Sequence, residues 1–350
     1  MGLRNHVVVV TGASSGIGRA TAEAFARKGC AVVLAARREE ALEATAHECA
    51  KHRGARTLVV PTDMTDAKAV EDLARRAVEE FGRIDVWVNN AAVNAFGRFE
   101  DVPLEDFRKV LDVNVMGYVH GARAALRVMR EQCTGTLINI ASIVGAVAQP
   151  YSHPYGMSKH AVRGLGSSLR QQLRVEGVKG IEVCTVLPAT IDTPHFQQAA
   201  NYTGRKVVAM PPVYTPERVA RAVVRLVRRP RREVVVGPAG RALVRQSRMA
   251  PGLAERAMAR QTDKTHLSHD EEAPATHGTL HVPAEGEGSV HGGWGGPRRT
   301  ALRRTAVAAA LAGAAVAAGR RVTHGPAGDA RPGGCLTGTR GRRVRAHRPQ

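Results

Sequence analysis

The sequence predicts an α/β fold, in which a doubly wound parallel sheet of about seven strands carries helices on both of its faces. Two observations support this prediction. Over residues 1–247, short β-branched runs alternate with longer amphipathic stretches, which is typical of successive βαβ units. A glycine-rich turn at residues 11–18 separates the first strand-like run from the first helix-like stretch. Beyond residue 247 the alternation has stopped, and we expect a low-order C-terminal extension there.

The strands and helices of this first domain can be placed in order along the chain. Strands are expected at residues 6–10, 31–35, 57–61, 85–88, 136–141, 181–187 and 233–236. Helices are expected at residues 16–28, 39–53, 67–81, 104–130, 154–176 and 216–228. Right-handed crossovers between such units produce a Rossmann-like sheet, whose ligands bind beyond the carboxyl ends of the strands.

The connection at residues 190–215 interrupts this alternation of strands and helices. Thr190-Ile-Asp-Thr-Pro194 is followed by polar residues and then by Met210-Pro-Pro212. A connection of this length is uncommon inside a compact domain and is often a lid or a binding loop. We therefore expect a substrate lid here, with a plain surface excursion as the alternative.

Cysteine usage and the N-terminus bear on the cellular compartment. The five cysteines form no C-x-x-C pair, which argues against a disulfide scaffold and a zinc site and fits a reducing cytosol. The N-terminus leads directly into the apolar run at residues 7–10, without a signal segment. We expect a cytoplasmic protein.

The net charge of +20 would normally indicate a nucleic acid or an anionic membrane as partner. Its distribution weakens that inference. Residues 298–350 contain twelve arginines and a single acid, Asp329, whereas residues 248–297 contain four bases and seven acids. Part of the net positive charge therefore lies in residues 298–350, and we do not expect a nucleic-acid partner.

The C-terminal extension divides into three parts by composition. Residues 248–300 read as a polar linker of low order, and the histidines within it match no known metal-ligand spacing, so no metal site is predicted. Residues 301–321 contain the alanine-rich stretch 306–318, flanked by arginines, which is too short to span a bilayer. A helix at an anionic membrane surface or one packed on the core fits it equally, and residues 322–350 read as a disordered basic tail.

The glycine-rich turn has the features of a dinucleotide site. Gly12, Gly16 and Gly18 follow a strand and open a helix. Glycine permits the tight turn and a close approach of backbone N–H groups to a phosphate, and the helix N-terminus adds a positive dipole. At the end of the second strand the chain reads Ala35-Ala36-Arg37-Arg38, with two guanidiniums where an acid would bind a free ribose 2′-hydroxyl. We therefore predict NADP(H) in preference to NAD(H).

A second constellation involves Tyr155 and Lys159, which lie one turn apart on an expected helix. A neighbouring ammonium favours the phenolate, so we expect the pKa of Tyr155 to be lowered. Ser142, at the end of an expected strand, could hold a substrate oxygen against this phenol. Taken alone, a Y-x-x-x-K pair is also compatible with an ordinary surface helix.

The co-occurrence of these motifs gives the sequence a family resemblance. With the glycine-rich turn, Asn89-Asn90-Ala91-Ala92, Asn114, Ser142 and the Tyr155/Lys159 pair in this order, residues 4–240 resemble a short-chain dehydrogenase/reductase of the NADP(H)-preferring type. Ala92 replaces the last glycine of the family's N-N-A-G stretch, and Pro188-Ala189 replaces proline-glycine. Neither departure removes a reacting group.

The resemblance implies a role for each matched residue. Ser142 would polarise the substrate carbonyl, Tyr155 would transfer the proton, and Lys159 would bind the nicotinamide ribose and lower the tyrosine pKa. Asn114 would hold a water in the proton path, and Asp63 would hold the adenine ring. The implied cofactor-binding residues are Gly12, Ser14, Ser15, Gly16, Ile17, Gly18, Arg37, Arg38, Asp63, Met64, Asn89, Asn90, Ala91, Tyr155, Lys159, Pro188 and Thr190.

These observations lead to one main functional hypothesis: an NADP(H)-dependent oxidoreductase that interconverts a carbonyl and an alcohol, with Tyr155 as general acid/base. The expected substrate pocket is lined by Val93, Phe96, Val144, His153 and Phe196, of which His153 also fits a plain loop histidine. The resemblance implies a homodimer or homotetramer through the helices at residues 104–130 and 154–176. Two alternatives are a catalytically silent NADP(H)-binding sensor or scaffold, and a reductase directed to a membrane surface by residues 298–350.

Overall fold

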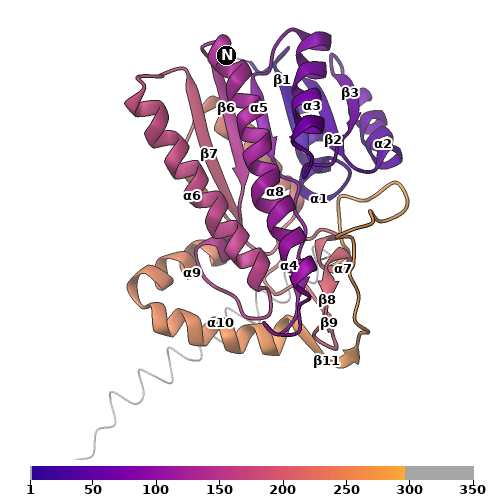
Figure 1. Ribbon diagram of the computed structural model, residues 1–350, viewed down its shortest axis with the longest axis vertical. Helices are drawn as coiled ribbons and strands as arrows, with labels where there is room; N and C mark the ends of the chain where they lie inside the picture. The colour runs from indigo at the N-terminus through magenta and orange to yellow at the C-terminus, as the bar shows by residue number, and fades with distance from the viewer. Residues whose placement is uncertain (1, 296–350) are drawn as a thin grey trace, which may run out of the picture. The chain divides into compact units, whose positions relative to one another are not determined.

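The computed structural model describes residues 2–295 of the chain. The alanine-rich stretch 306–318, the basic tail and Cys335 lie outside the described residues. Its centre is a parallel sheet of seven strands in the order β10-β7-β6-β4-β1-β2-β3 (Figure 1). The strands are β1 (Val7–Thr11), β2 (Ala31–Ala36), β3 (Arg56–Pro61), β4 (Val86–Asn89), β6 (Gly135–Ile140), β7 (Ile181–Pro188) and β10 (Glu233–Val236). The seven predicted strands are confirmed, with boundaries that shift by no more than one residue.

Helices cover both faces of this sheet, as the alternation predicts (Figure 1). Val8 and Val10 of β1 lie in a buried cluster with α1, α2 and α8, whereas Val7 and Val9 lie in a second buried cluster with α3 and α5. Successive side chains of a strand point to opposite faces, so a run of valines serves both layers. These helices are α1 (Gly16–Ala26), α2 (Glu39–Ala50), α3 (Ala67–Phe81), α5 (Gly117–Glu131) and α8 (Pro216–Arg228).

The stretch expected as one helix at residues 104–130 is interrupted. It consists of α4 (Leu104–Leu111), a π-helical turn η1 (Asp112–Met116) and α5. A π-turn inserts one residue into the helical ladder and is often found at functional sites. The insertion fixes the direction of Asn114, which lies inside it. The helix expected at residues 154–176 is α6 (His153–Val175).

The connection at residues 190–215 is tied to other parts of the chain. It contains the short helix α7 (His195–Gln198), β8 (Ala200–Asn201), which pairs with β5 (Ala95–Phe96), and β9 (Arg205–Val207). β9 pairs with β11 (Leu267–Glu272), a strand of the C-terminal extension. This connection therefore lies between the sheet domain and the extension.

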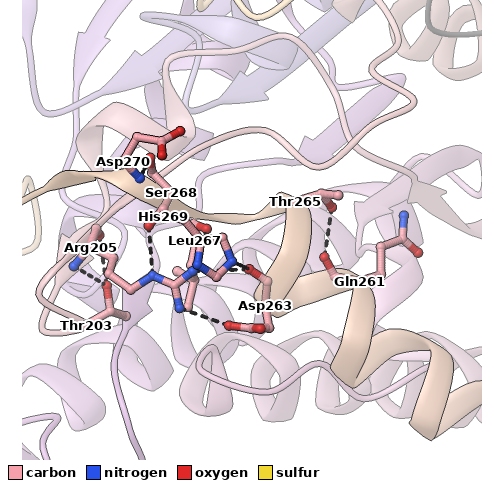
Figure 2. A network of polar contacts seen from close by, with 9 residues as sticks. All are labelled: Thr203, Arg205, Gln261, Asp263, Thr265, Leu267, Ser268, His269 and Asp270. Carbon is pink, nitrogen blue, oxygen red and sulfur yellow. Dashed lines mark hydrogen bonds and ion pairs between the residues drawn. The ribbon is translucent and has the colours of Figure 1, made fainter.

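The C-terminal extension differs from the polar linker of low order that its composition indicates. After β10 the chain forms α9 (Pro238–Met249), α10 (Pro251–Thr265) and β11. Figure 2 shows one reason: the Arg205 guanidinium donates to the carbonyl oxygens of Leu267 and Ser268, both at 2.8 Å, and to the Asp263 carboxylate at 2.9 Å. Val244, Met258 and Leu267 are also buried. A few apolar anchors and one multiply bonded arginine thus order a segment of mostly polar composition.

Beyond β11, residues 273–294 cross the domain without helix or strand, and we term them the strap. The strap is the orange segment at the right of Figure 1. Leu280 packs with Val102 and Val110, and Val290 packs with Ala20 and Ala220 of α1 and α8. Within residues 2–295 no helix combines the length and apolarity that crossing a bilayer would require.

Candidate active site

A cavity of about 280 Å³ lies at the carboxyl ends of the central strands. Its first end is lined by the glycine-rich turn, Arg37, Arg38 and Asp63. Its second end contains Ser142, Tyr155 and Lys159. The cavity therefore brings together the two constellations that the sequence analysis treats separately.

The glycine-rich turn lines the first end because its glycines allow a tight approach. Gly12 and Gly16 have φ values of +65° and +53°, and a Cβ at Gly18 would lie 2.0 Å from the Gly12 carbonyl oxygen. The Asn90 side chain donates to the Thr11 carbonyl oxygen at 2.9 Å and joins the ends of β1 and β4. Of the predicted cofactor residues, Gly18 and Asn89 do not line the cavity. Asn89 is buried beneath it and bonds to Trp87 and Asn139.

Charged groups at this end have distinct surroundings. Burial and the neighbouring Arg37 guanidinium lower the pKa of Arg38. Burial raises the pKa of Asp63, but hydrogen bonds from the Thr65 amide and hydroxyl, at 2.9 and 2.8 Å, outweigh it and hold the pKa below its usual value. Two cations and one carboxylate thus line the cavity where the sequence predicts the 2′-phosphate and the adenine.

Lys159 occupies the second end with its side chain fully enclosed. It is 1 % exposed, and its ammonium donates to the Ile140 carbonyl oxygen at 2.9 Å and to the Tyr118 hydroxyl at 3.3 Å. Its Nζ lies 5.3 Å from the centre of the Tyr155 ring. The two side chains therefore share one compartment, as their helical spacing predicts.

The expected lowering of the Tyr155 pKa is not found. Burial raises the pKa of Tyr155 to about 12, although the Ser142 hydroxyl acts in the opposite direction. Burial also lowers the pKa of Lys159 to about 7. The expectation considered only the attraction between the two charges, whereas in an enclosed site desolvation disfavours both charged forms.

Asn114 forms hydrogen bonds that join two segments beside Tyr155 and Lys159. It is fully buried, and its amide nitrogen donates to the Val93 carbonyl oxygen at 2.9 Å and to the Ser158 hydroxyl at 3.0 Å. Its amide oxygen accepts from the Val93 N–H at 2.9 Å. The side chain thus connects the segment after β4 to the helix that carries Tyr155.

The predicted substrate pocket is assembled in part. Val93, Phe96, Val144 and Phe196 line the cavity. His153 does not, because its ring packs edge-on against Phe99, with centroids 5.5 Å apart. Burial lowers its pKa.

Several lining residues were missed by the sequence analysis. The His195 ring centre lies 5.3 Å from that of Tyr155. Burial, with the nearby charges of Lys159 and His266, lowers the pKa of His195 to about 4, so this imidazole is neutral. Its Nε2 and the Nε2 of Gln149 are buried without a hydrogen-bond partner among the described residues. His195 and Met210 lie within the predicted lid, which was the available signal for both; Gln149, Met258 and His266 carried none.

The strap forms part of the wall at the first end of the cavity. Thr279, Pro283 and Ala284 line it. Arg37 donates to the carbonyl oxygens of residues 279–281, and Arg38 donates to those of residues 284–286. The Gly16 N–H, at the start of α1, donates to the Ser289 carbonyl oxygen at 2.9 Å. The strap thus contacts the groups that the sequence analysis assigns to cofactor phosphates.

Comparisons with known proteins agree with this arrangement. A sequence profile of the short chain dehydrogenase family matches residues 6–203. The chain is 36 % identical over 258 residues to the uncharacterized oxidoreductase YxnA of Bacillus subtilis, which covers 73 % of this chain and 72 % of that one. It is 35 % identical over 240 residues to an uncharacterized oxidoreductase of Staphylococcus aureus, a match of 67 % of this chain and 98 % of that one.

Two solved structures of oxidoreductases also superpose on this chain. A short-chain dehydrogenase/reductase from Burkholderia phymatum in complex with NAD superposes with a TM-score of 0.66 at 29 % identity, covering 72 % of this chain and 96 % of that one. An alcohol dehydrogenase from the archaeon Thermococcus sibiricus, complexed with 5-hydroxy-NADP, gives a TM-score of 0.58 at 29 % identity, with 66 % and 96 % covered.

Proposed function

This chain belongs to the short-chain dehydrogenase family of oxidoreductases, and from that premise we propose that it uses NADP(H) to interconvert a carbonyl and an alcohol, with Tyr155 as general acid/base. The observation that carries this proposal is the single cavity that joins the glycine-rich turn and its two arginines to Ser142, Tyr155 and Lys159. Binding alone would need no proton donor at the second end.

A dinucleotide would fit the donors that line the first end, provided that its phosphates replace the strap carbonyls that Arg37, Arg38 and the Gly16 N–H bind in this structure. The N–H groups of the turn and the start of α1 suit the pyrophosphate, Arg37 and Arg38 suit a 2′-phosphate, and the Asp63 carboxylate suits the adenine. When bound, the nicotinamide supplies the hydride. At the end of β2, Ala36 stands where an acid would bind a free 2′-hydroxyl, and the two guanidiniums that follow it support NADP(H) over NAD(H).

Ser142, Tyr155 and Lys159 have different roles at the substrate oxygen. In the reductive direction, the Ser142 hydroxyl donates a hydrogen bond to the carbonyl oxygen and orients it. The Tyr155 phenol then transfers its proton to that oxygen as the alcohol forms. The Lys159 ammonium stabilises the phenolate that remains, and the Ile140 carbonyl and Tyr118 hydroxyl keep this ammonium in place.

The lining of the second end supports a particular substrate class. Phe96, Val144, Phe196, Met210 and Met258 make it largely apolar. Beyond Lys159, none of the described residues that line this end is charged at neutral pH, since burial lowers the pKa of both lining histidines to about 4. We infer an uncharged, lipophilic carbonyl compound with one further polar group, which the neutral His195 or Gln149 can bind.

The exposed surface supports self-association. Leu104 of α4, Met116 of η1 and Met157 of α6 are 86, 44 and 54 % exposed, and they lie in the two helical stretches through which the family resemblance implies association. We infer a homo-oligomer that covers them, and light scattering of the purified chain would measure its mass.

The decisive experiment is a turnover screen with NADPH and a panel of aldehydes and ketones, followed by Tyr155→Phe on the best substrate. We expect the variant to bind NADPH nearly as well as the wild type and to lose at least ~10³-fold in kcat, because the proton donor is removed. A variant that retained most of the activity would refute the role of Tyr155. Binding of NADPH without turnover of any substrate would favour a silent sensor.

A further inference from the structure

A buried carboxylate outside the active-site cavity meets two histidines of the strap. Asp106, in the first turn of α4, has a fully buried side chain. One carboxylate oxygen lies 3.0 Å from His277 Nδ1, and the other lies 2.7 Å from His281 Nε2. Among the described residues, its only ion-pair partners are these two imidazoles. The three ligand atoms lie within 4.8 Å of one another.

A tight turn brings the two histidines to this point. Gly278 has a φ of +52°, and a Cβ there would lie 2.4 Å from the Gln198 carbonyl oxygen, so only glycine fits. The Thr279 N–H donates to that same oxygen at 2.9 Å, and Leu280 is buried against β5 and β8. These contacts fix the turn independently of Asp106, so the imidazoles are oriented in advance.

The donor set and its geometry suit a transition-metal ion. Two imidazole nitrogens and one carboxylate oxygen, with an open fourth position, are a common ligand set for Zn²⁺. The two rings are inclined at 76° to each other, and their nitrogens face the two oxygens of one carboxylate. Ligand atoms of a tetrahedral Zn²⁺ lie roughly 3.3 Å apart, given bonds of ~2.0–2.1 Å. The nitrogen-to-oxygen separations of 2.7 to 3.2 Å therefore need to widen by roughly 0.1 to 0.6 Å, and the two imidazole nitrogens lie within 4.8 Å of each other.

The surroundings provide both access and support. His277 and His281 are 58 and 43 % exposed, so an ion and a water ligand can reach them from solvent. The Tyr202 hydroxyl donates to the Asp106 carboxylate oxygen that faces His277, and the hydroxyl also lies 3.0 Å from His277 Nδ1, so it contacts two of the three candidate ligands, as outer partners of metal ligands commonly do. A divalent cation would also compensate a carboxylate that is otherwise enclosed and negative.

We propose that Asp106, His277 and His281 bind a divalent transition-metal ion, with Zn²⁺ as the best match, and that this ion fastens the strap across the cofactor end of the cavity. After His281 the strap accepts from Arg38 at residues 284–286 and from the Gly16 N–H at Ser289, and it ends where Trp294 donates to Asp192 and Thr193. A fixed point at His277 and His281 restrains one end of this crossing, and the Trp294 contacts restrain the other. Bound NADP(H), in the function proposed above, would then leave more slowly when the metal is present.

The first test is metal binding by the full chain. After treatment with a chelator and desalting, we expect calorimetry with ZnCl₂ to show a site that His277→Ala and His281→Ala each weaken by at least ~100-fold, since loss of an outer partner alone costs 10–100-fold. Co²⁺ should give the visible absorption of a four-coordinate ion in the wild type and not in these variants. His269→Ala, which removes a histidine of β11 outside the cluster, is the matched control. Because both substituted side chains are half-exposed, the variants should fold.

Two results would overturn the proposal. Wild-type Zn²⁺ affinity in the His277→Ala/His281→Ala double variant would show that the cluster is only a hydrogen-bonded contact. A Zn²⁺ site that leaves the NADPH dissociation rate unchanged would refute the fastening, for which we expect a slowing of at least threefold that His281→Ala abolishes. Failure of NADPH to bind at all would count against the proposed function, while the metal titration would still decide on the site.

Discussion

Replacing Arg37 and Arg38 by alanine tests the proposed cofactor preference directly. A 2′-phosphate that accepts hydrogen bonds from both guanidiniums gains ~1.5–3 kcal/mol from each charged contact. Loss of two such contacts amounts to ~3–6 kcal/mol. Since 1.4 kcal/mol is a factor of ten, the Kd for NADPH should rise roughly 10²–10⁴-fold in the double variant.

The expected effect on NADH is much smaller, because NADH has no 2′-phosphate. The two arginines donate six hydrogen bonds to strap carbonyls, so their removal also loosens the strap. These hydrogen bonds are partly exposed and their acceptors are neutral carbonyls. Their loss should weaken the binding of both cofactors to the same extent. We expect about a tenfold rise in the Kd for NADH from a net loss of ~1–1.5 kcal/mol.

Calorimetry measures the Kd for NADPH and for NADH at one salt concentration, in the wild type, each single variant and the double variant. The ratio of the two rises in Kd then separates the 2′-phosphate contact from the loosening of the strap. Arg53→Ala, an exposed arginine beyond the end of α2, is the control for a simple loss of positive charge. Equal factors for NADPH and NADH in the double variant would refute the 2′-phosphate role and leave the arginines as anchors of the strap.

Three further predictions concern stability and the strap. Because burial lowers the pKa of Lys159 from 10.5 to about 7, the unfolded chain binds more protons between these values, so stability should rise with pH there, by at most ~1.4 kcal/mol per unit. In urea titrations at pH 7 and 9, Lys159→Met should remove this rise; an unchanged slope would refute it. Gly292→Ala would bring a Cβ to 2.2 Å from the Thr193 carbonyl oxygen, so limited proteolysis should cut the strap at least ~10-fold faster, and more than in Gly252→Ala, where nothing lies within 4 Å and φ is not in the left-handed region. His195→Phe fills the same space without a hydrogen-bonding nitrogen, and we expect kcat/KM to fall ~10-fold or more for substrates with a second polar group and little for those without; equal losses would contradict that role.

The sheet domain could be predicted from sequence because its signals are local. Runs such as residues 7–10 and 31–35 are apolar and buried on both faces, and each is followed by an amphipathic stretch of helical length. The π-turn at Asn114 could not be foreseen, because it depends on packing between α4, α5 and α6 and leaves no periodic trace.

The site was less predictable where it depends on distant contacts. Asp106 and His277 are 171 residues apart, and neither position carries a recognisable ligand motif by itself. The direction of the Tyr155 pKa depends on how completely the protein encloses Tyr155 and Lys159, which spacing on a helix does not reveal. The order of residues 248–295 depends on a few anchors such as Arg205 and Met258, whereas composition averages over all of them.

The cavity is lined by residues from two parts of the chain, and this bears on how its substrate selectivity can change. The proposed reacting groups and the glycine-rich turn lie within residues 6–203, which the family profile matches, yet Met258, His266 and Pro283, which also line the cavity, come after that region. The Staphylococcus aureus relative is matched over 98 % of its length by only 67 % of this chain, so a third of the chain has no counterpart there. We therefore expect mutations in residues 251–295 to change which substrates are accepted and to leave the proposed hydride and proton transfer unchanged, so that a chimera carrying another extension would differ in selectivity and not in mechanism.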